Sequence, residues 1–446
     1  IRSGGKMKLK LKIIVILFSI LMVILVGIKI RNDLNPQNNI EQKTKEIFSS
    51  INTSSFAKIT KYIVYGTNFN LEGKIEIPQI SKISVSKVNL IVQDLNGEQK
   101  ILKASYKYSD GVLNFSTIEE INNGINLEKL NSEKYFFFIE VIFSNNEKYN
   151  YSLKNETEYG DITYYTITKN NTNKVINIGF NEYNDISYMG AEISDIENLP
   201  DDIYDIVIDA SHGGKDTGTK NGEYNEADIV LDCSNILKAQ LEEMGYKVFV
   251  TRDETMGKDV DTTLNMYDDD GRVNIANNTH AKILISLHID KSAKSNSGVE
   301  IYAPCLSNLS FAKSMADNIV KYANTSYSSS DLFKEDDGVY VRNYRTWDIL
   351  EQKNAAIRNK YEPYNITTST PFLYMIRECG GIATNAFVDG RNKVYGKNNF
   401  VNSNIGIETY VVELGNMINN KDLENVVNHS DLYMKGISES IQNYYN

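Results

Sequence analysis

The chain has few cysteines and no excess of positive charge, and each absence excludes a class of protein. Its 446 residues include only 3 cysteines. They are scattered and lack Cys-x-x-Cys spacing, so the sequence contains neither a disulfide framework nor a structural zinc site built on thiolates. The formal net charge is −11, whereas a nucleic-acid-binding protein normally carries a basic face. We therefore expect unpaired cysteines and no nucleic-acid partner.

Several common catalytic motifs are also missing. The sequence has no His-Glu-x-x-His, no Gly-x-Ser-x-Gly and no P-loop, which excludes the usual metalloproteases, esterases and nucleotide hydrolases. Hydrophobic residues make up 41% and charged residues 24% of the chain, as in ordinary globular proteins. At about 150 residues per domain, the length predicts two or three domains.

One long apolar run is present, near the N-terminus. Residues 13–30 are almost wholly apolar and follow a basic segment, residues 1–12. A helix over this run reaches roughly the ~30 Å of a bilayer core if its flanking lysines extend to the interface. No small-residue cleavage site follows, which favours an uncleaved transmembrane signal anchor over a cleaved signal peptide. The basic segment would then lie in the cytoplasm and the rest of the chain outside the cell.

The next two segments differ in composition. Residues 31–49 are rich in Asn, Gln and Lys, which predicts a polar stalk. In residues 50–200, short β-branched and aromatic runs alternate with Asn, Gly and Asp. This pattern predicts an all-β, sandwich-like domain, with a small barrel as the alternative. We find no catalytic motif there, and interpret the domain as a spacer or as an interaction domain for another envelope protein.

Three apolar runs in the C-terminal half end near chemically active side chains. The first run leads to His212, the second ends at His288, and the third carries Glu413. Short apolar runs bounded by glycine predict buried strands. Ligands of open α/β sheets bind beyond the carboxyl ends of the strands. Residues 203–446 therefore predict an α/β domain with a twisted central sheet flanked by helices, and one candidate site.

A helix start adds a fourth side chain to this site. Asn225 precedes a run whose apolar residues follow the 3.6-residue period up to Gly245, which predicts a helix capped by Asn225. Glu226 would then lie on the first turn, where a carboxylate interacts favourably with the helix dipole.

An ordered set of motifs in residues 203–446 resembles the type 3 family of zinc-dependent N-acetylmuramoyl-L-alanine amidases. The motifs are His212-Gly-Gly-x-Asp216-x-Gly218, Glu226, Thr251-Arg-Asp, Arg272-x-x-x-Ala-Asn277, Ser286-x-His288, Gly298-Val-Glu-Ile-Tyr302 and Val412-Glu413-Leu-Gly415. Each motif is weak alone, but their order and spacing together are specific.

The resemblance implies that His212, Glu226 and His288 hold zinc and that Glu413 is the catalytic glutamate. Three protein ligands leave one tetrahedral position open for a water, and zinc lowers the pKa of such a water to about 7. Glu413 would act as general base and then acid while the bond between N-acetylmuramic acid and L-alanine is cleaved. The substrate would be peptidoglycan, and the catalytic domain would face the cell wall from an anchor in the cell membrane.

Three further residues are candidates for supporting the ligands or binding substrate. Asp216 could accept the ring N–H of a ligand histidine, and a turn-capping role is the alternative. Asp290 stands where the family mostly has asparagine. Arg377 lies in an insertion, at about residues 324–404, that is longer than the family core needs. Long insertions of this kind tend to be lids or binding loops, so we expect it to shape substrate access.

Two other functions remain open from the sequence. The chain could be an envelope scaffold, catalytically silent or activated by a partner, that keeps the metal site. It could also be a zinc peptidase that cleaves another bond of the stem peptide. The presence of all four expected functional side chains disfavours the scaffold.

Overall fold

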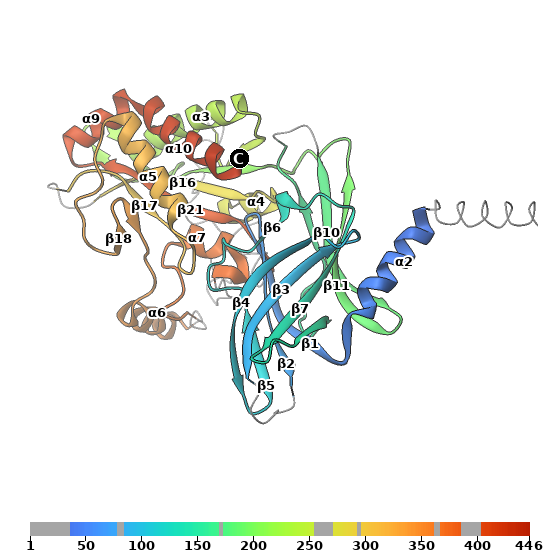
Figure 1. Ribbon diagram of the computed structural model, residues 1–446. Coiled ribbons are helices and arrows are strands. Elements are labelled where there is room, and N and C mark those ends of the chain that lie inside the picture. Colours follow the sequence, from blue (N-terminus) through green and yellow to red (C-terminus); the bar gives the residue numbers. More distant parts are fainter. Residues whose placement is uncertain are drawn as a thin grey trace, which may run out of the picture.

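The computed structural model describes residues 36–77, 84–168, 173–253, 271–291, 296–360, 366–384 and 403–446. In these residues, a β-rich N-terminal part lies against an α/β C-terminal part (Figure 1). The predicted membrane segment lies outside the described residues. None of the described helices is long and apolar enough to cross a membrane.

The β-rich part contains a closed ring of strands, so the sandwich-like arrangement expected from the sequence is wrong. In order around the ring, the strands are β1 (Ile51–Tyr65), β2 (Asn68–Glu76), β5 (Val112–Ser116), β4 (Gln99–Ser109), β3 (Val85–Asp94), β7 (Lys134–Phe143) and β8 (Lys148–Asn155). The ring closes because β8 pairs with β7 on one side and with β1 on the other. Buried side chains such as Leu71, Leu90 and Phe137 form its core. Alternating patterns predict strands but do not specify which edges meet.

Further elements extend this ring. The sheet continues from β7 through β11 (Ile186–Asp195), β10 (Lys174–Tyr183) and β9 (Ile162–Tyr165). A short strand, β6 (Ile125–Asn126), pairs with β2 and leads into the 3-10 turn η1 (Leu127–Lys129).

The described residues of the predicted polar stalk, 36–49, are helical. Helix α2 (Pro36–Ser49) projects from the β-rich part in Figure 1. Ile47 and Phe48 at its end are buried in a cluster with Phe136 and Tyr188. These two apolar side chains fix the end of the helix to the sheet, so residues 36–49 form a helix with one anchored end.

The C-terminal part is built on a mixed sheet. Its strands, in spatial order, are β15 (Val248–Val250), β12 (Ile206–Ala210), β16 (Ile283–Asp290), β21 (Glu408–Asn416), β17 (Glu300–Tyr302), β19 (Val339–Tyr340) and β18 (Lys334–Asp336). The first four are parallel, whereas β17 runs antiparallel to β21. This is the α/β architecture that the sequence predicts.

Helices cover the two faces of this sheet unequally (Figure 1). One face packs against α3 (Glu226–Glu243), α5 (Ser310–Ala323), α9 (Asn420–Asn428) and α10 (Ser430–Tyr445). The other face packs against the short helices α4 (Arg272–Asn278) and α7 (Tyr374–Cys379). Ile285 and Leu287 belong to the first core and Leu284 to the second. Because strand side chains alternate, His288 lies on the same face as Leu284.

The predicted insertion is partly integrated into this fold. Strands β18 and β19 extend the central sheet, and helix α6 (Thr346–Asn359), helix α7 and the 3-10 turn η3 (Gly381–Thr384) follow. Residues 361–365 and 385–402 lie outside the described residues.

The two parts of the chain share strand pairing. Strand β20 (Ile405–Gly406) lies in the C-terminal part but pairs with β1. Ile382 and Ala383 of η3 pack with Ile63, Tyr65 and two other residues of the β-rich part. The β-rich part therefore contacts the C-terminal part at the residues just before β21.

Candidate metal centre

Three side chains from different elements converge where the parallel strands end. His212 follows β12, His288 lies near the end of β16, and Glu226 is on the first turn of α3. As predicted, Asn225 caps this helix through its side chain, which accepts a hydrogen bond from the backbone N–H of Asp228 at 3.0 Å.

Two glycines make the turn after β12 possible. Gly213 has φ +116°, and a Cβ there would lie 2.8 Å from the Arg252 side chain. Gly218 has φ +63°, and a Cβ there would lie 2.7 Å from a Glu226 oxygen and 2.9 Å from His212. L-residues rarely adopt these backbone conformations. A larger residue at position 213 would clash with Arg252, and one at position 218 would clash with Glu226 and His212.

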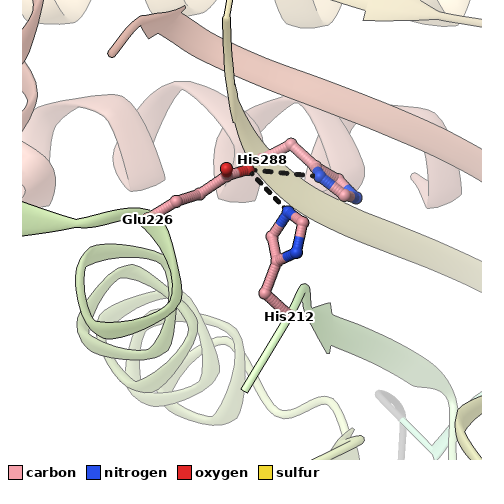
Figure 2. Close-up of side chains that lie close together, drawn as sticks. All are labelled: His212, Glu226 and His288. Atoms are coloured by element: carbon pink, nitrogen blue, oxygen red, sulfur yellow. Dashed lines mark ion pairs between the residues drawn. The ribbon is translucent and has the colours of Figure 1, made fainter. Parts of the chain in front are cut away.

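The three side chains form a compact group of donor atoms (Figure 2). The His212 Nε2 atom lies 3.1 Å from Glu226 Oε1, and the His288 Nδ1 atom lies 3.4 Å from the same oxygen. All three donor atoms lie within 4.8 Å of one another. Ligands bound to zinc at ~2.0–2.1 Å in tetrahedral geometry are ~3.3 Å apart. Two imidazoles and one carboxylate at these separations fit a zinc ion with an open coordination position.

Asp216 makes both of the contacts considered for it. Its Oδ2 atom lies 2.8 Å from His212 Nδ1, and its Oδ1 atom accepts a hydrogen bond from the backbone N–H of Gly218 at 3.0 Å. A carboxylate at Nδ1 favours the tautomer that leaves the Nε2 lone pair available for a metal. Burial lowers the pKa of His212, but hydrogen bonds and charges from Glu226 and Asp216 outweigh it and raise the pKa.

Glu226 is oriented by backbone groups. Its Oε2 atom accepts a hydrogen bond from the N–H of Thr219 at 3.0 Å, and Oε1 accepts one from the N–H of Ile289 at 3.1 Å. Burial raises the pKa of this carboxyl group, but the two histidines outweigh burial and lower it. The lowered pKa favours the ionised form of Glu226, and the two backbone hydrogen bonds fix the orientation of its carboxylate.

Glu413 lies directly beside this group. In the register of the sheet it is paired with His288 of β16 on one side and with Glu300 of β17 on the other. Its Oε2 atom is buried and has no hydrogen-bond partner among the described residues. Burial raises the pKa of Glu413 well above its ordinary value, and the charges of nearby carboxylates add to this effect. These carboxylates are Glu226, Asp290 and Glu300. A carboxylate with a raised pKa is a better proton acceptor.

Glu300 is a residue of this site to which the sequence assigned no role. It is buried, and its two oxygens accept hydrogen bonds from Ser328 Oγ at 2.6 Å and Tyr302 Oη at 2.7 Å. The motif Gly298-Val-Glu-Ile-Tyr302 contains it, but only the pairing of β17 with β21 reveals its position beside Glu413. Asp290, the residue predicted from the end of β16, is half-buried and acts electrostatically on both glutamates.

None of the described hydrogen bonds of Arg377 is to the metal-binding group. It is 2% exposed, and its guanidinium donates to Glu378, to the Tyr344 hydroxyl and to two backbone carbonyls of the insertion. These contacts fix α7 to the preceding loop.

A buried polar network supports the strands beneath the site. Asp209 of β12 is fully buried and accepts hydrogen bonds from Thr251 Oγ1 at 2.8 Å, Ser286 Oγ at 2.6 Å and Arg272 Nη1 at 3.0 Å. Arg252 donates to the carbonyls of residues 210, 211 and 227. The sequence motifs around Thr251 and Arg272 thus join β12, β15, β16 and α4 below the metal group.

The fold and the site together define an α/β protein with a candidate metal site at the ends of its parallel strands. A family model for N-acetylmuramoyl-L-alanine amidases matches residues 206–443, slightly more than half of the chain. The chain therefore belongs to the N-acetylmuramoyl-L-alanine amidase family. The matched range includes His212, Glu226, His288 and Glu413.

The individual relatives share only limited sequence identity with this chain. The amidase AmiC of Neisseria meningitidis is 34% identical over 99 residues, which span 22% of this chain and 22% of that protein. Among solved structures, amidase AmiC2 of Nostoc punctiforme is 20% identical over 54% of this chain and 96% of that chain, with a TM-score of 0.34. The amidase CwlD of Clostridioides difficile was solved in complex with the lipoprotein GerS. It is 17% identical over 54% of this chain and 98% of that chain, with a TM-score of 0.32.

Proposed function

We propose that the chain is a zinc-dependent amidase of peptidoglycan. It hydrolyses the amide bond between N-acetylmuramic acid and the L-alanine of the stem peptide. The observation that carries this proposal is the set of three metal-binding donor atoms with the partnerless Oε2 atom of Glu413 in the adjacent strand.

The residues of the site have distinct roles in this reaction. Zinc held by His212, Glu226 and His288 would supply a Lewis acid for the amide carbonyl and for the attacking water. Glu413 accepts a proton from the water as the oxygen attacks the carbonyl carbon. It returns a proton to the nitrogen as the carbon–nitrogen bond breaks. The products are a lactyl carboxylate and a peptide with a free L-alanine amino terminus.

The experiment is muropeptide release from purified peptidoglycan by the full chain, with zinc and after chelation. We expect free stem peptides with new L-alanine amino termini. Glu413→Gln should retain one equivalent of zinc and lose about 10²–10⁴-fold in kcat, since general acid–base catalysis contributes that much. His288→Ala should lose both zinc and activity.

Two outcomes would overturn this proposal. Cleavage at another bond would indicate a peptidase, and bound zinc without any cleavage would indicate a silent scaffold. The control is His280→Ala, because His280 is an exposed histidine with no place in the metal-binding group. This variant should keep full activity.

We also propose that residues 13–30 anchor the chain in the cell membrane as a single span, with the catalytic part facing the wall. The apolar run and its basic flank support this location. Deleting residues 13–30 should move the chain from the membrane fraction to the soluble fraction. If the full chain is already soluble after the cells are broken, the anchor proposal is wrong.

A further inference from the structure

Glu300 is a buried carboxylate that stands next to Glu413 in the central sheet. It is 5% exposed and is paired in register with Glu413 across β17 and β21. In an antiparallel pair, side chains directly opposite each other share one face of the sheet, with their Cβ atoms ~4.5–5.5 Å apart. The proton transfers of the proposed reaction use Glu413 but give Glu300 no role.

Two hydroxyl groups hold Glu300 in place. Its Oε1 atom accepts a hydrogen bond from Ser328 Oγ at 2.6 Å, and its Oε2 atom accepts one from Tyr302 Oη at 2.7 Å. The Tyr302 ring packs beside that of Tyr340, with the ring centroids 5.5 Å apart. Burial raises the pKa of Glu300 above the ordinary 4.5, and the two hydroxyl donors, which stabilise the anion, reduce this rise. The carboxyl group of Glu300 is therefore held in one orientation.

The carboxyl group of Glu413 is less well supported. Its Oε2 atom is buried and accepts no hydrogen bond from the residues that the structure describes. Its neighbours in the sheet are His288 of β16 on one side and Glu300 of β17 on the other. The side chain can therefore turn toward the metal-binding group or toward Glu300. A general base must lie within hydrogen-bond reach of the water that it deprotonates, so only the first orientation is productive.

The charge of Glu300 disfavours the second orientation. Two carboxylates directly opposite each other in a sheet repel, and water screens this repulsion little when the groups are buried. Because Ser328 and Tyr302 hold Glu300, it cannot turn away, and the repulsion acts on Glu413 instead. Asp290, whose charge also acts on Glu413, is half-buried and so is screened more strongly by water.

We propose that Glu300 is a positioning residue that keeps the carboxylate of Glu413 turned toward the metal-binding group. This inference rests on the proposed function. In this role, Glu300 acts through Glu413 and not on the substrate. Glu300→Gln keeps the shape of the side chain but replaces a repelling anion with an amide, which can donate a hydrogen bond to the Oε2 atom of Glu413. This hydrogen bond would turn the general base away from the attacking water.

The first test compares Glu300→Gln with the wild type as full, zinc-loaded chains. The variant should lower kcat for stem-peptide release by about 10²-fold, the loss expected from a small misplacement of a catalytic group. Its KM, zinc content and melting temperature should be nearly unchanged. Crystal structures should show the Glu413 carboxylate turned toward position 300 in the variant and toward His288 in the wild type. Tyr302→Phe, which frees one oxygen of Glu300, should lower kcat by a smaller factor.

A double-mutant cycle separates positioning from a general structural effect. If Glu300 acts only through Glu413, adding Glu300→Gln to Glu413→Gln should not lower kcat further. The matched control is Glu128→Gln. Glu128 also accepts a hydrogen bond from a tyrosine, Tyr164 Oη at 2.5 Å, but belongs to the β-rich part. This variant should keep the kcat of the wild type.

The results separate the inference from the function on which it rests. The role of Glu300 would be overturned, and the amidase left intact, by any of three results. These are an unchanged kcat or Glu413 orientation in Glu300→Gln, losses that multiply in the double variant, and a loss of zinc or folded protein that accounts for the fall in kcat. Failure of the wild type to release L-alanine amino termini would overturn the proposed function itself.

Discussion

At the scale of single residues, Asp216 has the most localised task. Its two oxygens join the ring of His212 to the backbone of Gly218, so one side chain orients both the ligand and the loop that carries it. Asp216 thus makes both contacts that the sequence offered as alternatives: it supports the ring of a histidine and it caps the turn.

Replacing Asp216 should weaken zinc binding without abolishing it. In Asp216→Ala, the His212 ring loses the acceptor that sets its tautomer, and we expect a fall in zinc affinity of about 10–100-fold. A competition titration against a chromogenic chelator measures this change. Asp216→Asn, which keeps one acceptor oxygen, should lose less. An unchanged zinc affinity in Asp216→Ala would show that the contact does not orient the ligand.

At the scale of elements, β21 links the domain junction to the site. Its first residue, Glu408, is fully buried at the junction, and Glu413 follows five residues later, ~17 Å along the strand. The Glu408 carboxylate accepts hydrogen bonds from Asn122 of the β-rich part at 3.0 Å and from the hydroxyls of Tyr410 at 2.5 Å and Tyr444 at 3.1 Å. All these donors are neutral.

The buried carboxyl group of Glu408 should make stability depend on pH. Burial raises its pKa above the ordinary 4.5, so the group favours the folded state below its unfolded pKa and this contribution is lost as the pH rises through the folded pKa. Glu408→Gln does not titrate. The free energy of unfolding of the wild type relative to Glu408→Gln should therefore fall as pH increases above about 4.5.

Urea unfolding at a series of pH values between 4.5 and 8 measures this difference. The control is Glu120→Gln, because Glu120 is an exposed residue of the same junction. Its free energy of unfolding should follow the same pH dependence as that of the wild type. Parallel curves for wild type and Glu408→Gln would contradict the prediction.

At the scale of the whole molecule, the β-rich part lies at the amino ends of two central strands. Besides Glu408, it contacts Lys282, the buried residue before β16, whose ammonium lies 5.2 Å from the ring centroid of Tyr164. The site lies at the opposite, carboxyl ends of the same strands. The β-rich part therefore supports the catalytic sheet from behind rather than forming part of the substrate edge.

Separating the two parts should cost stability. A fragment of residues 203–446 leaves β20 without β1 and exposes Glu408, Lys282 and the junction cluster around Ile382. Loss of several kcal/mol in a part of this size lowers the melting temperature by about 10 °C or more. Calorimetry of the fragment and of the full chain measures this shift. If the fragment melts at the same temperature as the C-terminal part does within the full chain, the two parts are independent.

Local sequence patterns predicted the parts of the site that depend on one element each. A short apolar run that stops at a histidine predicts a strand end, and an asparagine before an acidic, periodic run predicts a capped helix. His212, His288, Glu226 and Glu413 were identified in this way, together with the resemblance to the family. The positions of the two histidines at strand ends and of Glu226 at a helix start follow from the chain alone, because they depend on residues adjacent in sequence.

What depends on pairing between distant segments was decided only by the tertiary structure. The ring of β1 to β8 closes through an edge that no local pattern specifies, so the sequence could not distinguish a barrel from a sandwich. Glu300 comes beside Glu413 only because β17 pairs with β21. Neighbours in a sheet are brought together by hydrogen bonds between strands, and these contacts leave no periodic signal in either strand.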